Sequence, residues 1–182
     1  MWSTRCSTSL CSSCGRSWRA LGTDRGGGSP LGHWGGERLL FSIPEDLHRF
    51  RALTEGNAIV YGRRTLSTFP DGQPLPRRRN YVLTHTPETL SSDAVGVRSV
   101  DALLSASAGE NRLFVVGGEM IYRQLLPFCR AAWITQVDAD GAGDKFCPDL
   151  DADQAWALAD CGAWQEHGDL RYRFCCYKRK EL

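Results

Sequence analysis

The hydrophobic and polar positions of residues 39–53 repeat with the period of an α-helix. Leu47, Phe50 and Leu53 lie three residues apart, so their side chains share one face. Asp46 lies at the edge of that face. Because burial of a carboxylate beside apolar groups is costly without a partner, Asp46 has two interpretations. It is either a first-turn acid facing the helix dipole in solvent, or a group that pairs with a ligand carrying two adjacent N–H donors.

The ends of this helix are also indicated by the sequence. Ser42 and Glu45 have the spacing of a capping box, which predicts that the helix begins after Ser42. Pro44 suits the first helical turn, where a backbone N–H would have no partner. Gly56 is placed to end the helix.

Four apolar segments further along the chain predict buried strands, and helices are expected between them. The strands are residues 57–62 (NAIVYG), 80–84 (NYVLT), 112–116 (RLFVV) and 132–137 (AWITQV); the helices start at Arg63, after Ser99 and at Glu119. Near the C-terminus, residues 164–167 and 171–177 flank Gly168 and Asp169, which predicts an antiparallel hairpin. The alternation predicts an α/β fold with a single, mostly parallel twisted sheet, flanking helices and an antiparallel C-terminal hairpin. Ligands of such sheets lie beyond the carboxyl ends of the strands.

Composition narrows the function classes. The 182 residues suit one domain or slightly more, with 42% hydrophobic and 24% charged residues and a formal net charge of +1. A near-neutral chain has no general attraction to nucleic acid, and no apolar segment approaches the length of a membrane span, so neither partner is expected. The basic clusters at Arg63–Arg64 and Arg77–Arg79 favour a small anion instead.

The eight cysteines fall into two groups. Three early ones could bind zinc, but a fourth ligand at fitting spacing is missing, so no metal site is expected. We interpret the five later ones as reduced, small and mostly buried. The early group is Cys6, Cys11 and Cys14, and the later group is Cys129, Cys147, Cys161, Cys175 and Cys176.

Residues 1–36 differ from the rest of the chain. They are rich in Ser, Gly, Cys, Trp and Arg, with four arginines against the single acid Asp24, and no periodicity persists. A transit peptide is one interpretation, and a disordered tail is the one that we favour. We therefore divide the chain into an aberrant or disordered segment, 1–36, and a folded domain, 37–182.

Two strand ends have similar sequences. Residues 57–62 run into Arg63, Arg64 and Thr65, and residues 112–116 run into Gly117-Gly118. Helix N-termini and close-approach glycines both suit phosphate, although a single Gly-Gly pair is usually a plain turn. Two such ends in one sheet predict an extended phosphorylated cofactor lying across them.

Three further side chains have open interpretations at this level. Arg78 follows a proline-rich loop and is either an anion-binding group or part of a solvated basic turn; for Arg77 and Arg79 we accept the solvated turn. His85 is either a surface group or a donor near a phosphate. Thr135 lies in a strand, where β-branched residues are usually structural.

The chain resembles the dihydrofolate reductases from about Leu39 to the C-terminus. Six motifs in the same order carry the resemblance: IPEDL at 43–47, VYGRRT at 60–65, LPRRRN at 75–80, VVGG at 115–118 with Ile121-Tyr122, IT at 134–135, and GD at 143–144 ahead of Pro148. The resemblance implies the NADPH-dependent reduction of 7,8-dihydrofolate to tetrahydrofolate, in one-carbon metabolism. It also implies a cytoplasmic monomer that binds dihydrofolate and antifolate-type ligands.

The resemblance implies roles for individual residues. Asp46 is the catalytic acid that hydrogen-bonds the pterin ring and assists protonation at N5. The other substrate-binding positions are apolar walls, the carboxylate-binding arginine and the threonine that supports the acid: Leu47, Phe50, Arg78, Thr135, Val116 and Tyr122. The cofactor-binding positions are the two strand-end turns and the wall of the adenosine end: Gly62, Arg63, Arg64, Thr65, Thr84, His85, Gly117, Gly118, Glu119, Met120 and Ile121.

The N-terminus departs from the family pattern. An apolar first strand with a Val-Ala-x-Asp-like segment is expected at the centre of the sheet, and residues 1–29 contain no such sequence. We interpret this as a reading-frame error or a degraded N-terminus. Two alternatives therefore stay open: a related pteridine or pyrimidine reductase of the riboflavin pathway, and a catalytically impaired nucleotide-binding remnant that lacks its first strand.

Overall fold

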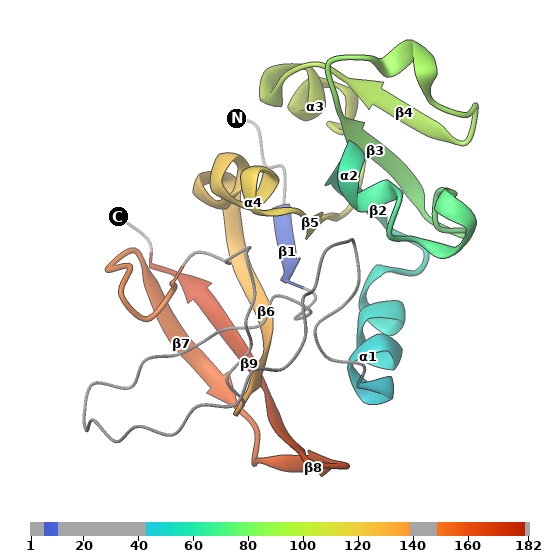
Figure 1. Ribbon diagram of the computed structural model, residues 1–182. Helices are drawn as coiled ribbons and strands as arrows, with labels where there is room; N and C mark the ends of the chain where they lie inside the picture. The colour runs from blue at the N-terminus through green and yellow to red at the C-terminus, as the bar shows by residue number, and fades with distance from the viewer. Residues whose placement is uncertain (1–5, 11–42, 139–148, 181–182) are drawn as a thin grey trace, which may run out of the picture.

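The computed structural model describes residues 43–138 and 149–180, and the backbone of residues 6–10. A sheet of nine strands runs through these parts of the chain, in the order β4-β3-β2-β5-β1-β6-β9-β7, with β8 paired to β9 (Figure 1). The strands are β1 (Cys6–Leu10), β2 (Ala58–Gly62), β3 (Arg79–Leu83), β4 (Ala94–Val97), β5 (Leu113–Gly117), β6 (Cys129–Val137), β7 (Trp156–Cys161), β8 (Gln165–His167) and β9 (Leu170–Arg179). The α-helices are α1 (Pro44–Thr54), α2 (Arg63–Leu66), α3 (Val100–Ala106) and α4 (Glu119–Leu125), and single 3₁₀ turns span Pro70–Gly72, Pro87–Thr89 and Leu126–Phe128.

The strand directions confirm the predicted fold class. Strands β4, β3, β2, β5, β1 and β6 pair in parallel, and β9 pairs antiparallel with β6, β7 and β8. Strand β8 and the start of β9 form the expected hairpin around Gly168, whose φ is +58°. The carboxyl ends of the parallel strands therefore meet at one edge of the sheet.

The expectation that residues 1–29 contain no central strand is wrong. Strand β1 lies between β5 and β6 and pairs in parallel with both. A small, polar segment such as CSTSL has no apolar pattern that would predict a buried strand, but backbone pairing on two sides does not require one. The expected domain boundary at residue 36 lies outside the described residues.

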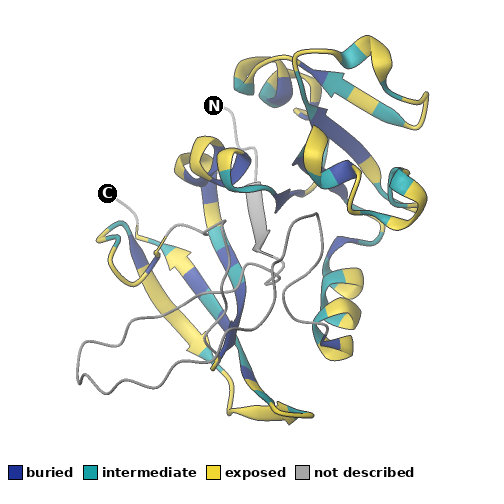
Figure 2. Cartoon of the chain, viewed as in Figure 1, coloured by how far each residue is buried: buried dark blue, intermediate teal, exposed yellow. Residues whose placement is uncertain are grey.

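Both faces of the sheet are covered, which is why its central strands are apolar without alternation. Along β2, Ala58 and Val60 face one core cluster, and Ile59 and Tyr61 face the other. Helices α3 and α4 cover the first cluster through Leu103, Ile121, Tyr122 and Leu125. Helices α1 and α2 cover the second through Phe50, Leu53 and Leu66. Figure 2 shows the buried residues along these strands and exposed residues on the outer sides of the helices.

Helix α1 begins one residue later than the capping box predicts. Its N-cap is Ile43, without a side-chain cap hydrogen bond, and Pro44 is the first helical residue. Ser42 lies outside the described residues. A buried Ile43 packs with Val137 and Tyr172, so an apolar contact holds the start of the helix where a hydroxyl cap was expected. Gly56 follows the helix with φ +75°, as expected for a residue that ends it.

The interpretation of all later cysteines as reduced is wrong for one pair. Cys161 and Cys175 are directly opposite in the antiparallel pair β7–β9 and form a disulfide. Facing positions of antiparallel strands bring Cα atoms close together, and here they are 4.1 Å apart. Among the other described cysteines, Cys176 is a free thiol and Cys129 Sγ donates to the Leu125 carbonyl over 3.1 Å, whereas Cys147 lies outside the described residues.

Candidate active site

A hydrogen bond between helix α1 and strand β6 defines the candidate site. The Thr135 hydroxyl donates to Asp46 Oδ1 over 2.6 Å. Thr135 is buried, with 7% of its surface exposed, and Asp46 is half-buried. The carboxylate therefore faces the sheet and is not a solvent-exposed first-turn acid. A half-buried carboxylate held by a neutral donor remains suited to a ligand with N–H groups.

The predicted apolar wall is present in part. Phe50 packs on the cluster that contains buried Val116, on the side of the sheet that α1 covers. Leu47 lies one residue after Asp46 and keeps 43% of its surface exposed. Tyr122 belongs to the other core cluster and is 2% exposed.

Arg78 lies at the C-terminal end of α1. Its Nε donates to Thr54 Oγ1 over 2.8 Å, its Nη1 donates to the Pro76 carbonyl over 2.8 Å, and its guanidinium lies 5.8 Å from the centroid of the Phe50 ring. Burial lowers the pKa of the Arg78 guanidinium, and the nearby Glu55 carboxylate raises it. A guanidinium held in this way can present its remaining donors to a carboxylate.

The neighbouring arginines occupy other environments. Arg77 pairs with Glu55 over 2.6 Å, and Arg79 pairs with Glu110 over 3.3 Å. Both side chains are more than half exposed, at 61% and 62%. These values agree with the solvated turn predicted for both residues.

The two predicted strand-end turns lie against each other. β2 and β5 are neighbours in the sheet, and a Cβ built on Gly117 would lie 2.9 Å from Thr65 Cγ2. A Cβ on Gly118 would lie 3.4 Å from Thr65 Oγ1. On the other side, a Cβ on Gly62 would lie 3.1 Å from Ile121. The absence of a side chain at these glycines thus allows the start of α2 and the start of α4 to pack closely, with Gly117 buried and Gly118 half-buried between them.

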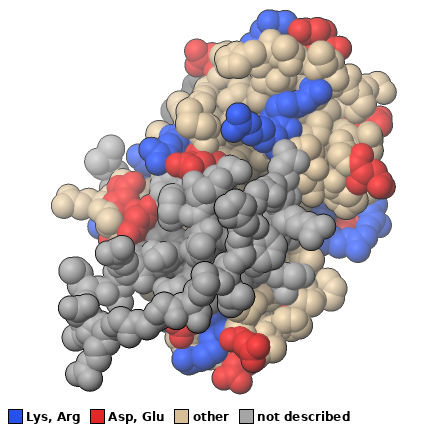
Figure 3. All heavy atoms as spheres, in the orientation of Figure 1, with Lys and Arg blue, Asp and Glu red and all other residues tan. Residues whose placement is uncertain are grey.

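The remaining predicted cofactor positions are spread around these turns. Arg63 and Arg64 are exposed at the start of α2, and Arg63 Nη1 donates to Thr89 Oγ1 over 2.7 Å. Thr84 Oγ1 accepts from the Thr86 amide over 3.2 Å, after strand β3. Glu119 pairs with Arg123 over 2.8 Å. Figure 3 shows a basic group of side chains on the described surface, with acidic side chains interspersed on the same face.

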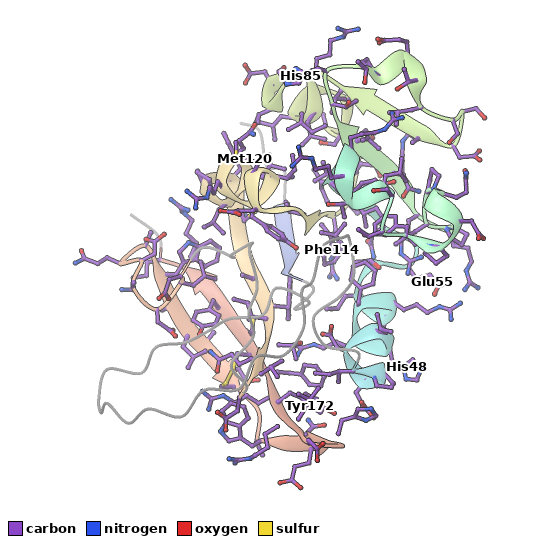
Figure 4. The ribbon with its side chains drawn as sticks, viewed as in Figure 1. His48, Glu55, His85, Phe114, Met120 and Tyr172 are labelled. Carbon is purple, nitrogen blue, oxygen red and sulfur yellow. A yellow bond between two sulfur atoms is a disulfide. The ribbon has the colours of Figure 1, made fainter. Side chains whose placement is uncertain are left out.

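The remaining two predicted cofactor positions with labelled side chains are His85 and Met120. In Figure 4, His85 lies toward the end of the molecule that carries α3, and Met120 lies on α4. Both are exposed, Met120 with 66% of its surface. The structure therefore places both side chains on the surface of the described chain.

Arg49 and Thr54 are site residues that the sequence reasoning missed. Arg49 lies one helical turn after Asp46, half-buried, with its guanidinium 4.4 Å from the centroid of the Phe174 ring. Burial lowers the pKa of Arg49, and the Asp46 carboxylate raises it. The i, i+3 spacing from Asp46 was the available signal. Thr54 was missed because its role depends on Arg78, which is distant in sequence.

No group of three or more His, Cys, Asp or Glu side chains among the described residues is arranged to hold a metal ion. The side chains of Cys6, Cys11 and Cys14 lie outside that description. None of the described helices is both long enough and apolar enough to span a membrane.

Comparisons with known proteins agree with this geometry. The family model described as dihydrofolate reductase matches residues 32–179. A dihydrofolate reductase of Mycobacterium leprae is 36% identical over 154 residues, covering 82% of this chain and 90% of that protein. One of Bacillus subtilis is 31% identical over 144 residues, covering 78% and 84%. The solved structure of dihydrofolate reductase from Enterococcus faecalis, complexed with NADP(H) and RAB-propyl, superposes with a TM-score of 0.71 at 26% identity, covering 80% of this chain and 87% of that one.

Proposed function

This chain belongs to the dihydrofolate reductase family, and we propose that the residues described above carry out the family's reaction in it. The reaction is the NADPH-dependent reduction of 7,8-dihydrofolate to 5,6,7,8-tetrahydrofolate. The observation that carries the proposal is the 2.6 Å hydrogen bond from Thr135 to Asp46. It joins a predicted site residue of α1 to one of β6, two elements that are distant along the chain, and it orients a half-buried carboxylate.

Asp46 is the catalytic residue of the proposed site. One carboxylate oxygen accepts from Thr135, and the carboxylate can accept N–H donors of the pterin as well. By holding the protonated form of the bound ring, the carboxylate favours proton uptake at N5. The carboxylate thus acts on the substrate rather than on the cofactor.

Phe50, Leu47 and Arg78 bind the rest of the substrate in this proposal. Phe50 packs on the core cluster beneath it and presents an apolar wall to the pterin and benzoyl groups. Arg78 lies 5.8 Å from the Phe50 ring centroid, at the end of α1 away from Asp46. This arrangement suits a substrate with a flat heterocycle at one end and a carboxylate at the other.

We place NADPH at the two described strand ends. When bound, NADPH supplies the hydride that reduces C6 of the substrate and leaves as NADP⁺. Gly117, Gly118 and Thr65 would hold its pyrophosphate through backbone N–H groups, and Arg63 and Arg64 would hold the further phosphate. This placement is supported by the contact between the two turns, since a Cβ on Gly117 would lie 2.9 Å from the Thr65 methyl group. The other cofactor positions form the surrounding wall.

We also infer a cytoplasmic monomer that binds antifolate-type ligands, an inference that rests on the family. Sedimentation of the purified protein tests the monomer, and titration with a 2,4-diaminopyrimidine antifolate tests the ligand class. The alternative of an impaired remnant without a first strand loses its premise, because β1 occupies the centre of the sheet.

The proposed function is tested by NADPH oxidation with and without dihydrofolate. We expect Asp46→Asn to lower kcat by about 10²- to 10⁴-fold, the range for loss of a general acid–base group, with the Kd for NADPH unchanged. Asp101→Asn is a matched control, because Asp101 is likewise a first-turn acid, on α3. Turnover of Asp46→Asn at the unmodified rate would remove Asp46 from the mechanism.

A further inference from the structure

Two residues on one face of helix α1 contact two residues that face each other across adjacent strands of the sheet. Thr135 of β6 and Phe174 of β9 are directly opposite in the antiparallel pair, so their side chains share one face. Asp46 and Arg49 are three residues apart and share one face of α1. Asp46 accepts from Thr135 over 2.6 Å, and the Arg49 guanidinium lies 4.4 Å from the Phe174 ring centroid. The contact between Arg49 and Phe174 therefore fixes the rotation of α1 about its axis. That rotation directs the Asp46 carboxylate toward Thr135.

Phe174 is itself held in place. Its ring meets the Tyr172 ring edge-on, with centroids 5.5 Å apart and an interplanar angle of 67°. Tyr172 is 1% exposed and packs with Ile43, at the start of α1, and with Val137. Figure 4 shows Tyr172 beside the lower end of α1, whereas His48 points away from the sheet on the outer side of the helix. The Phe174 ring is therefore a rigid support for Arg49.

Arg49 also carries its charge in a half-buried position. Its Nη1 atom is buried, and no hydrogen-bond partner for it exists among the residues that the structure describes. A buried donor of this kind is costly, and burial lowers the pKa of the guanidinium. The Asp46 carboxylate is the strongest influence in the opposite direction. The Asp46 carboxylate therefore stabilises the charged form of the Arg49 guanidinium.

We propose that Arg49 is a positioning residue of the reductase, which acts on dihydrofolate through Asp46. Stacked on Phe174, it fixes the direction of the Asp46 carboxylate, and its charge keeps that carboxylate ready for the pterin N–H groups. This inference rests on the proposed role of Asp46. A residue that only anchored the helix would affect stability and both ligands alike, whereas a residue that acts through Asp46 loses its effect once Asp46 is changed.

The experiment is a double-mutant cycle between positions 49 and 46. Arg49→Leu keeps apolar bulk over Phe174 and removes the charge, Arg49→Lys keeps the charge, and Phe174→Leu removes the ring. Each is made in the unmodified protein and in Asp46→Asn. The measurements are kcat/KM for dihydrofolate, the Kd of a 2,4-diaminopyrimidine antifolate and the Kd of NADPH. Arg98→Leu is the charge-matched control, since Arg98 is 64% exposed and pairs with Glu88.

We expect Arg49→Leu to lower kcat/KM for dihydrofolate about tenfold and to weaken the antifolate similarly, with NADPH affinity unchanged. Arg49→Lys recovers part of the loss, and Phe174→Leu reproduces part of it. In the Asp46→Asn background, Arg49→Leu adds less than a twofold effect. Arg98→Leu has no effect in either background.

Three results would overturn the role of Arg49. These are a further tenfold loss when Arg49→Leu is added to Asp46→Asn, an equal loss of NADPH affinity, and an unchanged kcat/KM in Arg49→Leu. If the unmodified protein does not turn over dihydrofolate, the proposed function fails. The double-mutant cycle measured through the Kd of the antifolate then still tests the coupling between positions 49 and 46. Absence of both turnover and antifolate binding overturns both proposals.

Discussion

At the scale of single residues, Thr54 joins Arg78, which we propose binds the substrate carboxylate, to helix α1. The Thr54 hydroxyl donates to the Phe50 carbonyl over 2.8 Å and accepts from Arg78 Nε over 2.8 Å. The guanidinium is thereby fixed beside the Phe50 ring before any ligand arrives. Preorganised forked donors are the usual means of binding a carboxylate tightly.

We expect Arg78→Leu to raise KM for dihydrofolate roughly tenfold to a hundredfold, because a charge-assisted pair with the substrate carboxylate is lost. Steady-state kinetics with each substrate varied in turn measure this, and KM for NADPH should stay the same. Arg79→Leu is the neighbouring control, since Arg79 pairs with Glu110 on the other side of the turn. Equal increases in both KM values would indicate misfolding and contradict the assignment.

The sequence predicted Asp46, Thr135 and Arg78 through their resemblance to a family, and the structure brings the first two into contact. It did not predict Arg49, because an arginine on an amphipathic helix is normally solvated. The i, i+3 spacing from Asp46 was the one local signal, and the contact of Arg49 with the Phe174 ring is what shows that position 49 faces the sheet. That contact joins residues that are distant along the chain, so the spacing alone did not reveal it.

At the scale of elements, the turns that begin α2 and α4, which we propose hold the cofactor, contact each other. Gly117 has φ +154°, and an added Cβ would lie 2.9 Å from the Thr65 methyl carbon and 3.1 Å from its hydroxyl. Either the threonine or the turn would have to move. The two strand ends would then no longer meet as they do.

We expect Gly117→Ala to raise the Kd for NADPH about tenfold or more and to lower the free energy of unfolding by about 1–3 kcal/mol. Fluorescence titration and urea unfolding measure the two effects. Thr65→Ser in the same chain removes the nearest methyl group and should restore part of both. Gly109→Ala is the control, because a Cβ there meets nothing within 4 Å. An unchanged Kd for NADPH in Gly117→Ala would show that this turn does not bind the cofactor.

Elements with strong local signals were predicted well. Ser99 caps α3 by accepting from the Ala102 amide over 3.1 Å, as its position suggested. Strands β4 and β7 were missed, because Ala94–Val97 is a short edge strand and Trp156–Cys161 is mostly exposed. Their pairing partners, and not their own sequences, make them strands.

At the scale of the whole molecule, β1 completes the sheet. Within the described chain it supplies the link between the β4-β3-β2-β5 half and the β6-β9-β7 half. Because it pairs on both sides, its backbone N–H and C=O groups stabilise both halves. The polar sequence of this strand gave no sign of that role.

We expect Thr8→Pro to lower the free energy of unfolding by about 3 kcal/mol or more, because proline cannot donate a ladder hydrogen bond in a central strand. Thr8 is paired with Ala132 of β6. Thr8→Ala keeps the backbone N–H and serves as the comparison in urea unfolding. Equal stability of the two variants would show that this segment does not pair at the centre of the sheet.

The position of β1 has a geometric consequence for the reaction. It separates β5, which ends at Gly117 beside the candidate cofactor turn, from β6, which carries Thr135 (Figure 1). Adjacent strands lie about 4.8 Å apart, so the width of this single strand sets a spacing of about 10 Å between the two halves. Hydride transfer tolerates little error in the distance between its two carbon atoms. In the proposed reaction, β1 would therefore be the spacer between donor and acceptor, and a change in its pairing register would alter the rate while every proposed binding residue stayed intact.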